Sequence, residues 1–324
     1  MMAALLGAAA LAALCLVLAC SLLASLFYPL RRESLQRLDP AARARRVLLW
    51  TASPLLLGIL LTALCLLPSA LAGVSIGTDH CPEHDDHHPH LCLLHPPHGR
   101  AFGAAAFAPL AAATALLAAA ARQLVRSSRL IRSLRGLSAA DTARDGVLLV
   151  ATEEPLSFTA GLLTPRVFLS RGIVAALPAS SLDLVIEHER AHVRRRDPLL
   201  WWMASTLSRL HLPWTRRLLL ADFALACEQD CDRSAALQSG DPVRVAEALL
   251  RVERLLGARR SRFVTPAMSF GGSDVDARVR HLLDPTSVAA SGRRWTYVLA
   301  AAALLAAADP LHHLTETALG LLTR

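Results

Sequence analysis

The chain has 324 residues, of which 54% are hydrophobic, and its mean hydropathy is +0.40. These values exclude an ordinary soluble globular protein, so part of the chain must lie in lipid. The net charge of +8 rests on arginine alone, because the sequence contains no lysine. The distribution of the arginines is therefore more informative than their sum.

Three long stretches without charged residues occupy the N-terminal part of the chain: 1–30, 47–78 and 101–121. Each reaches the roughly 20 apolar residues that cross a bilayer core, and each predicts a transmembrane helix. A secretory signal peptide is the alternative for the first stretch. That stretch has no basic residue before its apolar core, and the core is too long, so we expect it to be retained as an anchor.

The arginines around these stretches predict the topology. Six lie between the first two stretches and five follow the third, whereas the loop 79–100 has one arginine and several acidic residues. A single arginine run is usually no more than solvated charge, but this asymmetry follows the positive-inside rule. It predicts that the loop 79–100 lies outside the cell membrane and that residues 122–294 lie in the cytoplasm.

The loop 79–100 is rich in histidine. It contains two cysteines and seven histidines: Cys81, Cys92, His80, His84, His87, His88, His90, His95 and His98. This density suits the capture of Zn²⁺ or Cu²⁺ by imidazole. Two alternatives stay open. The cysteines form a disulfide outside the membrane, or the loop is a disordered polar segment without a function.

Residues 122–294 are enough for one compact domain. An arginine-rich helical connector is expected at about 123–137, and short apolar runs bounded by glycine and proline predict strands at 146–151 and 165–170. The second strand is a candidate sheet edge at which a substrate peptide is added as a further strand. Alternatively, its apolar side chains simply face the core.

After residue 171 the pattern changes to helical spacing, with Ser180 or Ser181 as the expected N-cap and Pro198 as the stop. This helix carries His188, Glu189 and His192 in an H-E-x-x-H motif. Residues four apart share one helix face, so the two imidazoles can bind one Zn²⁺. Glu189 would then act as general base on metal-bound water. The motif alone does not exclude a surface helix that merely exposes His and Glu.

A catalytic zinc site needs a third protein ligand, and the segment 226–233 offers Glu228 on a second predicted helix. Asp232 lies four residues later on the same face, where it can hydrogen-bond one of the histidines. Asp197, five residues after His192, can anchor a nearby Arg or His donor. Asp222 and Asp230 are the alternative third ligands.

The stretch 295–308 holds only 14 uncharged residues before Asp309. We favour a short fourth span followed by an interfacial tail. The alternative takes four polar residues into the headgroup region or an aqueous cavity: Asp309, His312, His313 and Glu316. The predicted organisation is a membrane domain at 1–121, a cytoplasmic domain at 122–294, and a C-terminal helix with its tail at 295–324.

Three segments resemble the integral-membrane metallopeptidases of the BlaR/MecR type: 158–169, 188–197 and 228–232. The resemblance covers most of the chain. It implies an antirepressor protease in which His188, His192 and Glu228 bind zinc and Glu189 is the general base. The β-lactam sensors of that type carry a penicillin-binding domain with a Ser-x-x-Lys motif. This sequence contains no lysine and so no such motif. The resemblance therefore leaves open which stimulus activates the protease.

We expect a mainly helical membrane protein with three N-terminal transmembrane helices, an α+β zincin-like domain and a short fourth transmembrane helix. The expected function is a zinc-dependent endopeptidase that cleaves a cytoplasmic protein in signal transduction, and the resemblance implies a winged-helix repressor of the BlaI/MecI type as a candidate substrate. A metal-sensing receptor with a non-catalytic zinc domain and a housekeeping membrane zinc protease are the alternatives. Glu189 favours an enzyme, because metal binding alone does not need a base. No DNA-reading motif is visible, so no direct binding of nucleic acid is expected.

Overall fold

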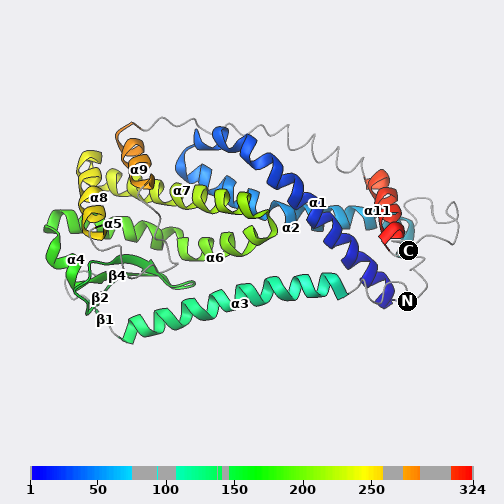
Figure 1. Ribbon diagram of the computed structural model, residues 1–324, viewed down its shortest axis with the longest axis horizontal. Helices are drawn as coiled ribbons and strands as arrows, with labels where there is room; N and C mark the ends of the chain where they lie inside the picture. Colours follow the sequence, from blue (N-terminus) through cyan, green and yellow to red (C-terminus); the bar gives the residue numbers. More distant parts are fainter. Residues whose placement is uncertain are drawn as a thin grey trace.

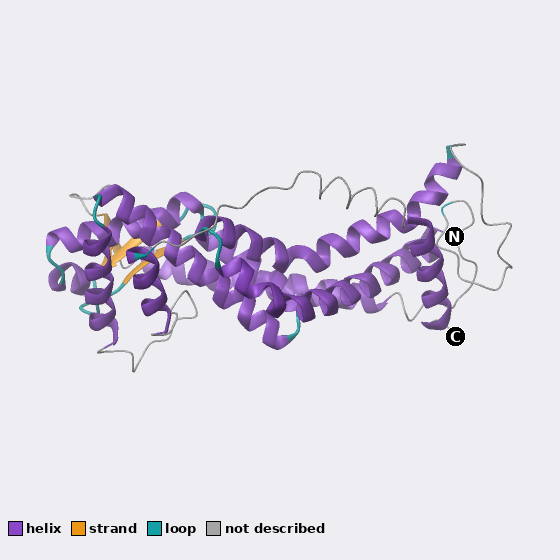
Figure 2. Cartoon of the chain, turned by 90° about the horizontal axis from the view of Figure 1, so that it is seen from above, coloured by secondary structure: helices purple, strands orange, loops and turns teal. Residues whose placement is uncertain are grey.

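The computed structural model describes residues 2–74, 93, 107–136, 138–140, 146–257, 273–284 and 308–322. The molecule is elongated, with its strands at one end and both termini at the other (Figures 1 and 2). Long helices connect the two ends. The histidine-rich loop, apart from Leu93, lies outside the described residues, and so does the stretch 295–307. The metal loop and the fourth span therefore stay predictions.

Three helices are long and apolar enough to cross a membrane, as predicted: α1 (Met2–Gln36), α2 (Pro40–Gly73) and α3 (Phe107–Gly136). α1 and α2 form a hairpin whose turn is fixed by Asp39, because its carboxylate accepts a hydrogen bond from the Ala41 amide at the start of α2. At most 28% of each apolar window is buried within the protein. The remaining surface, which includes many exposed leucines, is suited to lipid.

α3 joins the third apolar stretch and the arginine-rich connector in one continuous helix. No Gly or Pro interrupts it between Pro109 and Gly136, and the alanines of its first half are strong helix formers. The connector thus continues directly out of the membrane span towards the sheet (Figure 1).

The sheet has four strands in the order β1-β2-β4-β3: β1 (Ser138–Ala140), β2 (Val147–Val150), β3 (Ser157–Ala160) and β4 (Arg166–Ser170). β2 and β4 are parallel and the other pairs are antiparallel. Both predicted strands are therefore present. Their buried side chains pack against Ile173, Leu182 and Ile186 of the following helices, which forms the core of this end of the molecule.

Of the two interpretations of the strand 165–170, the sheet edge is wrong, and the alternative that its apolar side chains face the core is confirmed. β4 was the expected edge, but it lies between β2 and β3, and the edge near the helices is β3. The reason is that an apolar strand pattern specifies which faces are buried and not the order of the strands. β4 is buried at four of its five residues, as an interior strand should be, whereas every residue of β3 stays partly exposed.

The helices that follow are α4 (Arg171–Ala176), α5 (Ala179–Arg195), α6 (Asp197–Leu207), the 3-10 turn η2 (Ser208–Leu210), α7 (Pro213–Ser239), α8 (Pro242–Gly257) and α9 (Ser273–Leu283). The predicted N-cap of α5 is wrong, because Pro178 holds that position. The backbone carbonyl of Pro178 accepts hydrogen bonds from the amides of Ser181 and Leu182. The hydroxyl of Ser181 instead accepts a hydrogen bond from Arg251.

α11 (Ala308–Leu322) packs on α2 and α1 near the ends of these helices that lie away from the sheet (Figure 1). His312 is completely buried there and donates from Nδ1 to the carbonyl of Cys65 at 2.7 Å. Glu316 lies one turn later, 3.2 Å from His312 Nε2. The expected interfacial tail is thus a packed helix, because these polar side chains find partners inside the protein.

Candidate metal centre

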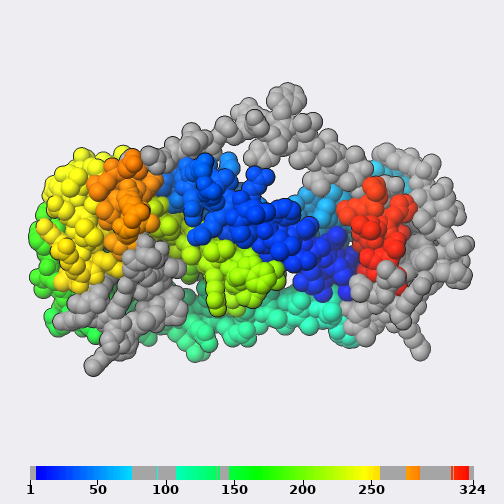
Figure 3. Space-filling model, turned by 45° about the horizontal axis from the view of Figure 1, so that its top comes forward, coloured from blue at the N-terminus to red at the C-terminus, as the bar shows by residue number. Residues whose placement is uncertain are grey.

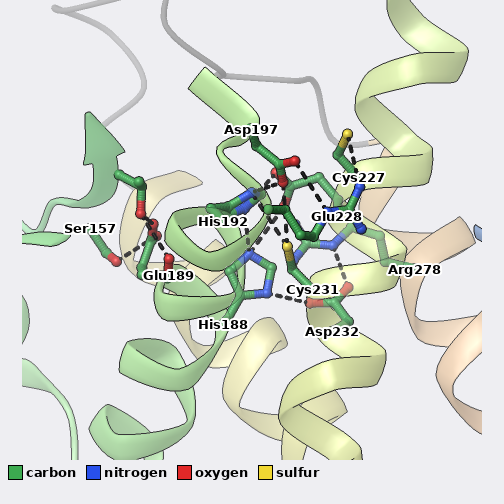
Figure 4. Close-up of polar contacts among 12 residues, drawn as sticks. Ser157, His188, Glu189, His192, Asp197, Cys227, Glu228, Cys231, Asp232 and Arg278 are labelled. Carbon is green, nitrogen blue, oxygen red and sulfur yellow. Dashed lines mark hydrogen bonds and ion pairs between the residues drawn. The ribbon is translucent and has the colours of Figure 1, made fainter. Parts of the chain in front are cut away.

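α5 places two imidazoles on one face, directed towards α7 (Figure 4). The Nε2 atoms of His188 and His192 are 3.2 Å apart, as the four-residue spacing predicts. His192 is buried, whereas the His188 side chain keeps 16% of its exposure. His192 therefore forms the buried side of the pair, and His188 forms the side that is partly open to solvent.

α7 supplies the third group. One carboxylate oxygen of Glu228 lies 3.4 Å from Nε2 of His188, and the other lies 3.4 Å from Nε2 of His192. A tetrahedral zinc ion with bonds of 2.0–2.1 Å requires ligand atoms about 3.3 Å apart. The 3.2 Å between the two nitrogens and the 3.4 Å from each nitrogen to one of the two Glu228 oxygens are close to this value, and ligand atoms of the three residues lie within 4.8 Å of one another. The donor set of two imidazoles and one carboxylate is also one that catalytic zinc sites use.

Two buried carboxylates hold the opposite nitrogens of the imidazoles. Nδ1 of His188 lies 2.9 Å from Asp232, and Nδ1 of His192 lies 2.7 Å from Asp197. If both Nδ1 atoms donate, both Nε2 atoms present a lone pair to the metal position, which is how outer carboxylates orient metal-binding histidines. The structure therefore brings both predicted supporting acids into contact with the predicted ligands.

A sharp turn between α5 and α6 returns Asp197 to the site. Arg196 adopts a left-handed conformation with a φ of 56°, the only positive φ of a residue other than glycine in the described parts of the chain. Asp197 then starts α6 and is also bound by Nε of Arg195 at 3.1 Å. The turn costs roughly 1–2 kcal/mol for a residue with a Cβ atom.

Arg278 is a site residue that the sequence reasoning missed. It reaches the centre from α9, where its guanidinium forms a bidentate pair with Asp232 at 2.7 and 2.8 Å and lies 2.9 Å from Glu228. The side chain is largely buried. Arg278 is one of 34 basic residues and lies 46 positions beyond Asp232, so no local spacing pointed to it. It ties α9 to the two acidic positions of α7.

The electrostatics of the centre favour a positive charge between the ligands. Burial alone would lower the pKa of His188, but the hydrogen bond and charge of Asp232, helped by Glu228, raise it to about 9. Burial would raise the pKa of Glu228, but Arg278 and the two imidazoles hold it well below its usual value. Without a metal, protons on the imidazoles supply the positive charge that a bound divalent cation would otherwise supply.

The model of one protein family matches residues 101–282, and its description is BlaR1 peptidase M56. The chain belongs to this family. No curated protein and no solved structure shows a significant similarity to it. The match covers the sheet, the H-E-x-x-H helix, Glu228 and Arg278. Together with the three apolar helices, it identifies a membrane metallopeptidase and confirms the resemblance seen in the sequence.

In this peptidase Glu189 points towards the sheet (Figure 4). Its two carboxylate oxygens accept hydrogen bonds from Ser157 and Thr159 of β3, each at 2.8 Å. The Thr159 hydroxyl also lies 3.0 Å from the Glu189 backbone carbonyl. Sequence reasoning missed these hydroxyls, although their alternation with Phe158 on a short strand places them on one face. They hold the carboxylate between the metal ligands and the edge strand.

The alternative third ligands lie elsewhere. Asp222 accepts hydrogen bonds at 2.8 Å from the Tyr28 hydroxyl and, in a bidentate pair, from Arg32 of α1. Asp230 pairs with Arg195 and Arg233. Both acids therefore have arginine partners and do not face the two Nε2 atoms.

The thiol of Cys231 lies on the Nδ1 side of His192, together with Asp197. Its sulfur lies 3.4 Å from Nδ1 of His192 and 3.7 Å from Asp197. His192, Asp197 and Cys231 could also hold a metal by distance, but all three are buried. Nδ1 of His192 is already paired with Asp197 there. The open position lies on the Nε2 side, with Glu228.

Proposed function

We propose that the protein is a zinc-dependent membrane endopeptidase in which His188, His192 and Glu228 bind the metal and Glu189 is the general base. The convergence of the two imidazole nitrogens and the Glu228 carboxylate carries this proposal: the nitrogens are 3.2 Å apart, and each lies 3.4 Å from one oxygen of Glu228, a spacing and donor set that suit zinc. The sheet, the H-E-x-x-H helix and the second ligand helix favour an α+β zincin-like fold.

The chemistry divides between the metal and the side chains. Zinc, when bound, lowers the pKa of a coordinated water and polarises the scissile carbonyl. Glu189 would accept a proton from the attacking water and pass it to the leaving amine. To do so, one of its oxygens exchanges the hydroxyl of Ser157 or Thr159 for the water. These two residues orient the carboxylate and hold it within reach of the metal position.

β3 is the edge that we propose for substrate binding. It is the outermost strand on its side of the described sheet, and its hydroxyls contact Glu189. A peptide added to this edge in an extended conformation would lie beside the catalytic carboxylate. The site thus fits an unfolded or flexible segment of a protein substrate.

Two further proposals concern the side of the membrane on which the domain lies and the class of substrate. The arginine distribution supports the first, and the family supports the second. We propose that residues 122–294 form a domain on the cytoplasmic side of the membrane, that 295–308 cross the membrane a fourth time, and that the substrate is a cytoplasmic protein. α9 packs on α7 and α8 at the end with the sheet, whereas α11 packs on α1 and α2 at the opposite end (Figure 1). This separation supports a further crossing between them. A winged-helix repressor of the BlaI/MecI type is the candidate substrate.

The test compares Glu189→Gln with Glu187→Gln in the full chain purified in detergent. Glu187 lies on the same helix and pairs with Arg190, so both variants lose one carboxylate from α5. We expect both to keep zinc and only Glu189→Gln to lose hydrolysis of a proteome-derived peptide library, measured by mass spectrometry. Undiminished hydrolysis by Glu189→Gln, or a wild type that hydrolyses equally well after zinc removal, would overturn the proposal.

A further inference from the structure

The hairpin formed by α6, η2 and α7 has an unusual composition. Residues 198–221 contain no acidic side chain but include three arginines and three tryptophans: Arg209, Arg216, Arg217, Trp201, Trp202 and Trp214. The hairpin starts at the metal centre, with Asp197. Its tip, residues 208–217, lies near the middle of the molecule. The space-filling view shows this segment between α1 and α3 (Figure 3).

The tip is hydrogen-bonded to the membrane helices. Ser21 of α1 donates to the carbonyl of Leu210, and Ser25 accepts from the amide of Leu212 at 3.1 Å. His211 is buried, and its Nε2 atom lies 3.1 Å from the carbonyl of Thr51 in α2. Two backbone groups of the turn therefore find their partners on α1, and the His211 side chain finds its partner on α2.

These contacts fix the depth of the tip. With a rise of 1.5 Å per residue, Ser25 and Ser21 lie about 9 and 15 Å along α1 from Arg31, its first charged residue. Thr51 lies about 8 Å along α2 from Arg46, the last charge before its apolar part. Both helices thus place the tip inside the apolar zone, beyond the charges that mark the membrane boundary.

The hydrogen bonds have a physical reason at this depth. Irregular backbone is tolerated within a bilayer only where protein groups satisfy its N–H and C=O groups. Ser21 and Ser25 do this for the Leu210 carbonyl and the Leu212 amide, whereas the Thr51 carbonyl satisfies the buried His211 side chain. The Thr215 hydroxyl adds a bond to the Ser25 carbonyl at 2.9 Å. A loop in water would not need such partners.

The outward side of the tip is basic and aromatic. Trp214 is 54% exposed, Arg209 and Arg217 are exposed, and Arg216 is partly exposed. Within the described part of the chain, none of these arginines forms an ion pair or a side-chain hydrogen bond. Arg209 and Arg216 lie close enough to repel each other. Three guanidinium groups without an ion-pair partner in the described residues, beside an apolar zone, are available to bind an anion.

We propose that this tip enters the bilayer leaflet nearest to the sheet and binds the phosphate of an anionic phospholipid through Arg209, Arg216 and Arg217. A guanidinium group pairs with phosphate oxygens in a bidentate manner, and a long arginine side chain reaches from the apolar zone up to the headgroup level. Trp214 takes the interfacial position that tryptophan prefers. The absence of acids over 198–221 keeps the anion from being repelled.

The bound lipid would fix the height of the metal centre above the membrane. α7 runs without interruption from Trp214 to Glu228, about 21 Å along one helix. A lipid held at the tip therefore restrains the helix that carries Glu228 against movement along the membrane normal. This role does not depend on the catalytic assignment of Glu189.

The experiment uses the full chain in bilayer nanodiscs that contain spin-labelled phosphatidylglycerol or spin-labelled phosphatidylcholine in a phosphatidylcholine background. We expect the wild type to prefer phosphatidylglycerol by about tenfold, since each arginine near the headgroups contributes to anionic lipid binding. The triple variant Arg209→Gln, Arg216→Gln, Arg217→Gln should lose most of this preference. Equal preference in wild type and triple variant would overturn the proposal.

A matched control removes the same charge at the far end of the molecule. Arg171, Arg244 and Arg254 are exposed on α4 and α8, and their triple replacement by Gln should leave the lipid preference unchanged. Because three changes at the tip could impair folding, Arg217→Gln alone, at an exposed position, should lower the preference by about twofold. A loss of preference in the control as large as in the tip variant would show a general charge effect and refute the specific site.

Two further arms distinguish a lipid headgroup from free phosphate and measure the depth of the tip. Inorganic phosphate at constant ionic strength should not displace phosphatidylglycerol; full displacement would show a site for free phosphate and refute the lipid site. Lipids brominated near the headgroup should quench the fluorescence of Trp214, identified as the difference between wild type and Trp214→Phe. If only a water-soluble quencher acts on Trp214, the tip lies outside the bilayer and the proposal fails.

Discussion

Glu228→Ala should weaken zinc binding far more than Asp222→Ala. Both acids lie on α7, six residues apart, and either substitution removes one negative charge. The carboxylate of Glu228 lies 3.4 Å from Nε2 of both His188 and His192, whereas that of Asp222 contacts Tyr28 and Arg32. The two variants thus separate the loss of a metal bond from a general electrostatic effect.

The magnitude follows from the number of ligands. Zinc binds protein sites with about 10–16 kcal/mol, so each of three protein ligands contributes on the order of 3–5 kcal/mol. Loss of Glu228 should therefore raise the zinc Kd by at least about a hundredfold, since 1.4 kcal/mol corresponds to tenfold. Asp222→Ala should change the Kd by less than about threefold. Asp232→Asn, which weakens the support of His188, should cost about 10- to 100-fold.

The assay is a competition for zinc between each purified variant and a chromophoric chelator of known affinity. Circular dichroism of each variant, taken before the titration, shows that the helices are intact. Asp222→Ala could weaken the contact with α1 without changing the metal bonds, so its melting temperature is recorded separately. If Asp222→Ala loses zinc and Glu228→Ala retains it, the ligand assignment is wrong.

Three further predictions concern the surroundings of the site. Thr159→Val should lower kcat by about 10- to 100-fold at saturating zinc without changing the zinc Kd, because the catalytic carboxylate loses a hydrogen bond of about 1.5–3 kcal/mol; an unchanged kcat would contradict this role. Arg278→Ala should lower the melting temperature markedly, because it leaves two buried carboxylates without their shared cation, whereas Arg280→Ala on the exposed face of α9 should not; equal melting temperatures would refute the difference. Reporter fusions at His90 and Gly240 should give signals from opposite sides of the membrane, and matching signals would disprove the predicted topology.

Two of the three candidate ligands could be predicted from the sequence because their spacing is local: His188 and His192 share a helix face. Glu228, 36 residues after His192, follows from the need for a third ligand and from the family resemblance. The three apolar helices follow from length and charge alone. The histidine pair and the apolar helices depend on residues within a few turns of one another, where the sequence pattern specifies geometry directly.

The remaining contacts depend on tertiary packing. Ser157 lies 32 residues before Glu189 and Arg278 lies 46 residues after Asp232, so neither partner has a local signature. The position of β4 inside the sheet depends on strand order, which the apolar pattern leaves open. The α6–α7 tip looked like part of a cytoplasmic domain because its apolar residues suit a soluble core as well as a membrane. Its contacts with Ser25 and Thr51 are the basis for the depth that we propose.

α7 unites these parts, and its charges explain why the centre suits a cation. The helix packs against α1 and α2, α5 and α9, so apolar residues occur around its whole circumference and each acid in it needs a positive partner. Asp222 has Arg32, and Asp230 has Arg195 and Arg233. Glu228 and Asp232, however, share one arginine, Arg278, and their other charged partners among the described residues are His188 and His192. The two acids therefore draw positive charge to the imidazoles, and a zinc ion held by the two nitrogens and the Glu228 carboxylate would supply that charge in place of protons.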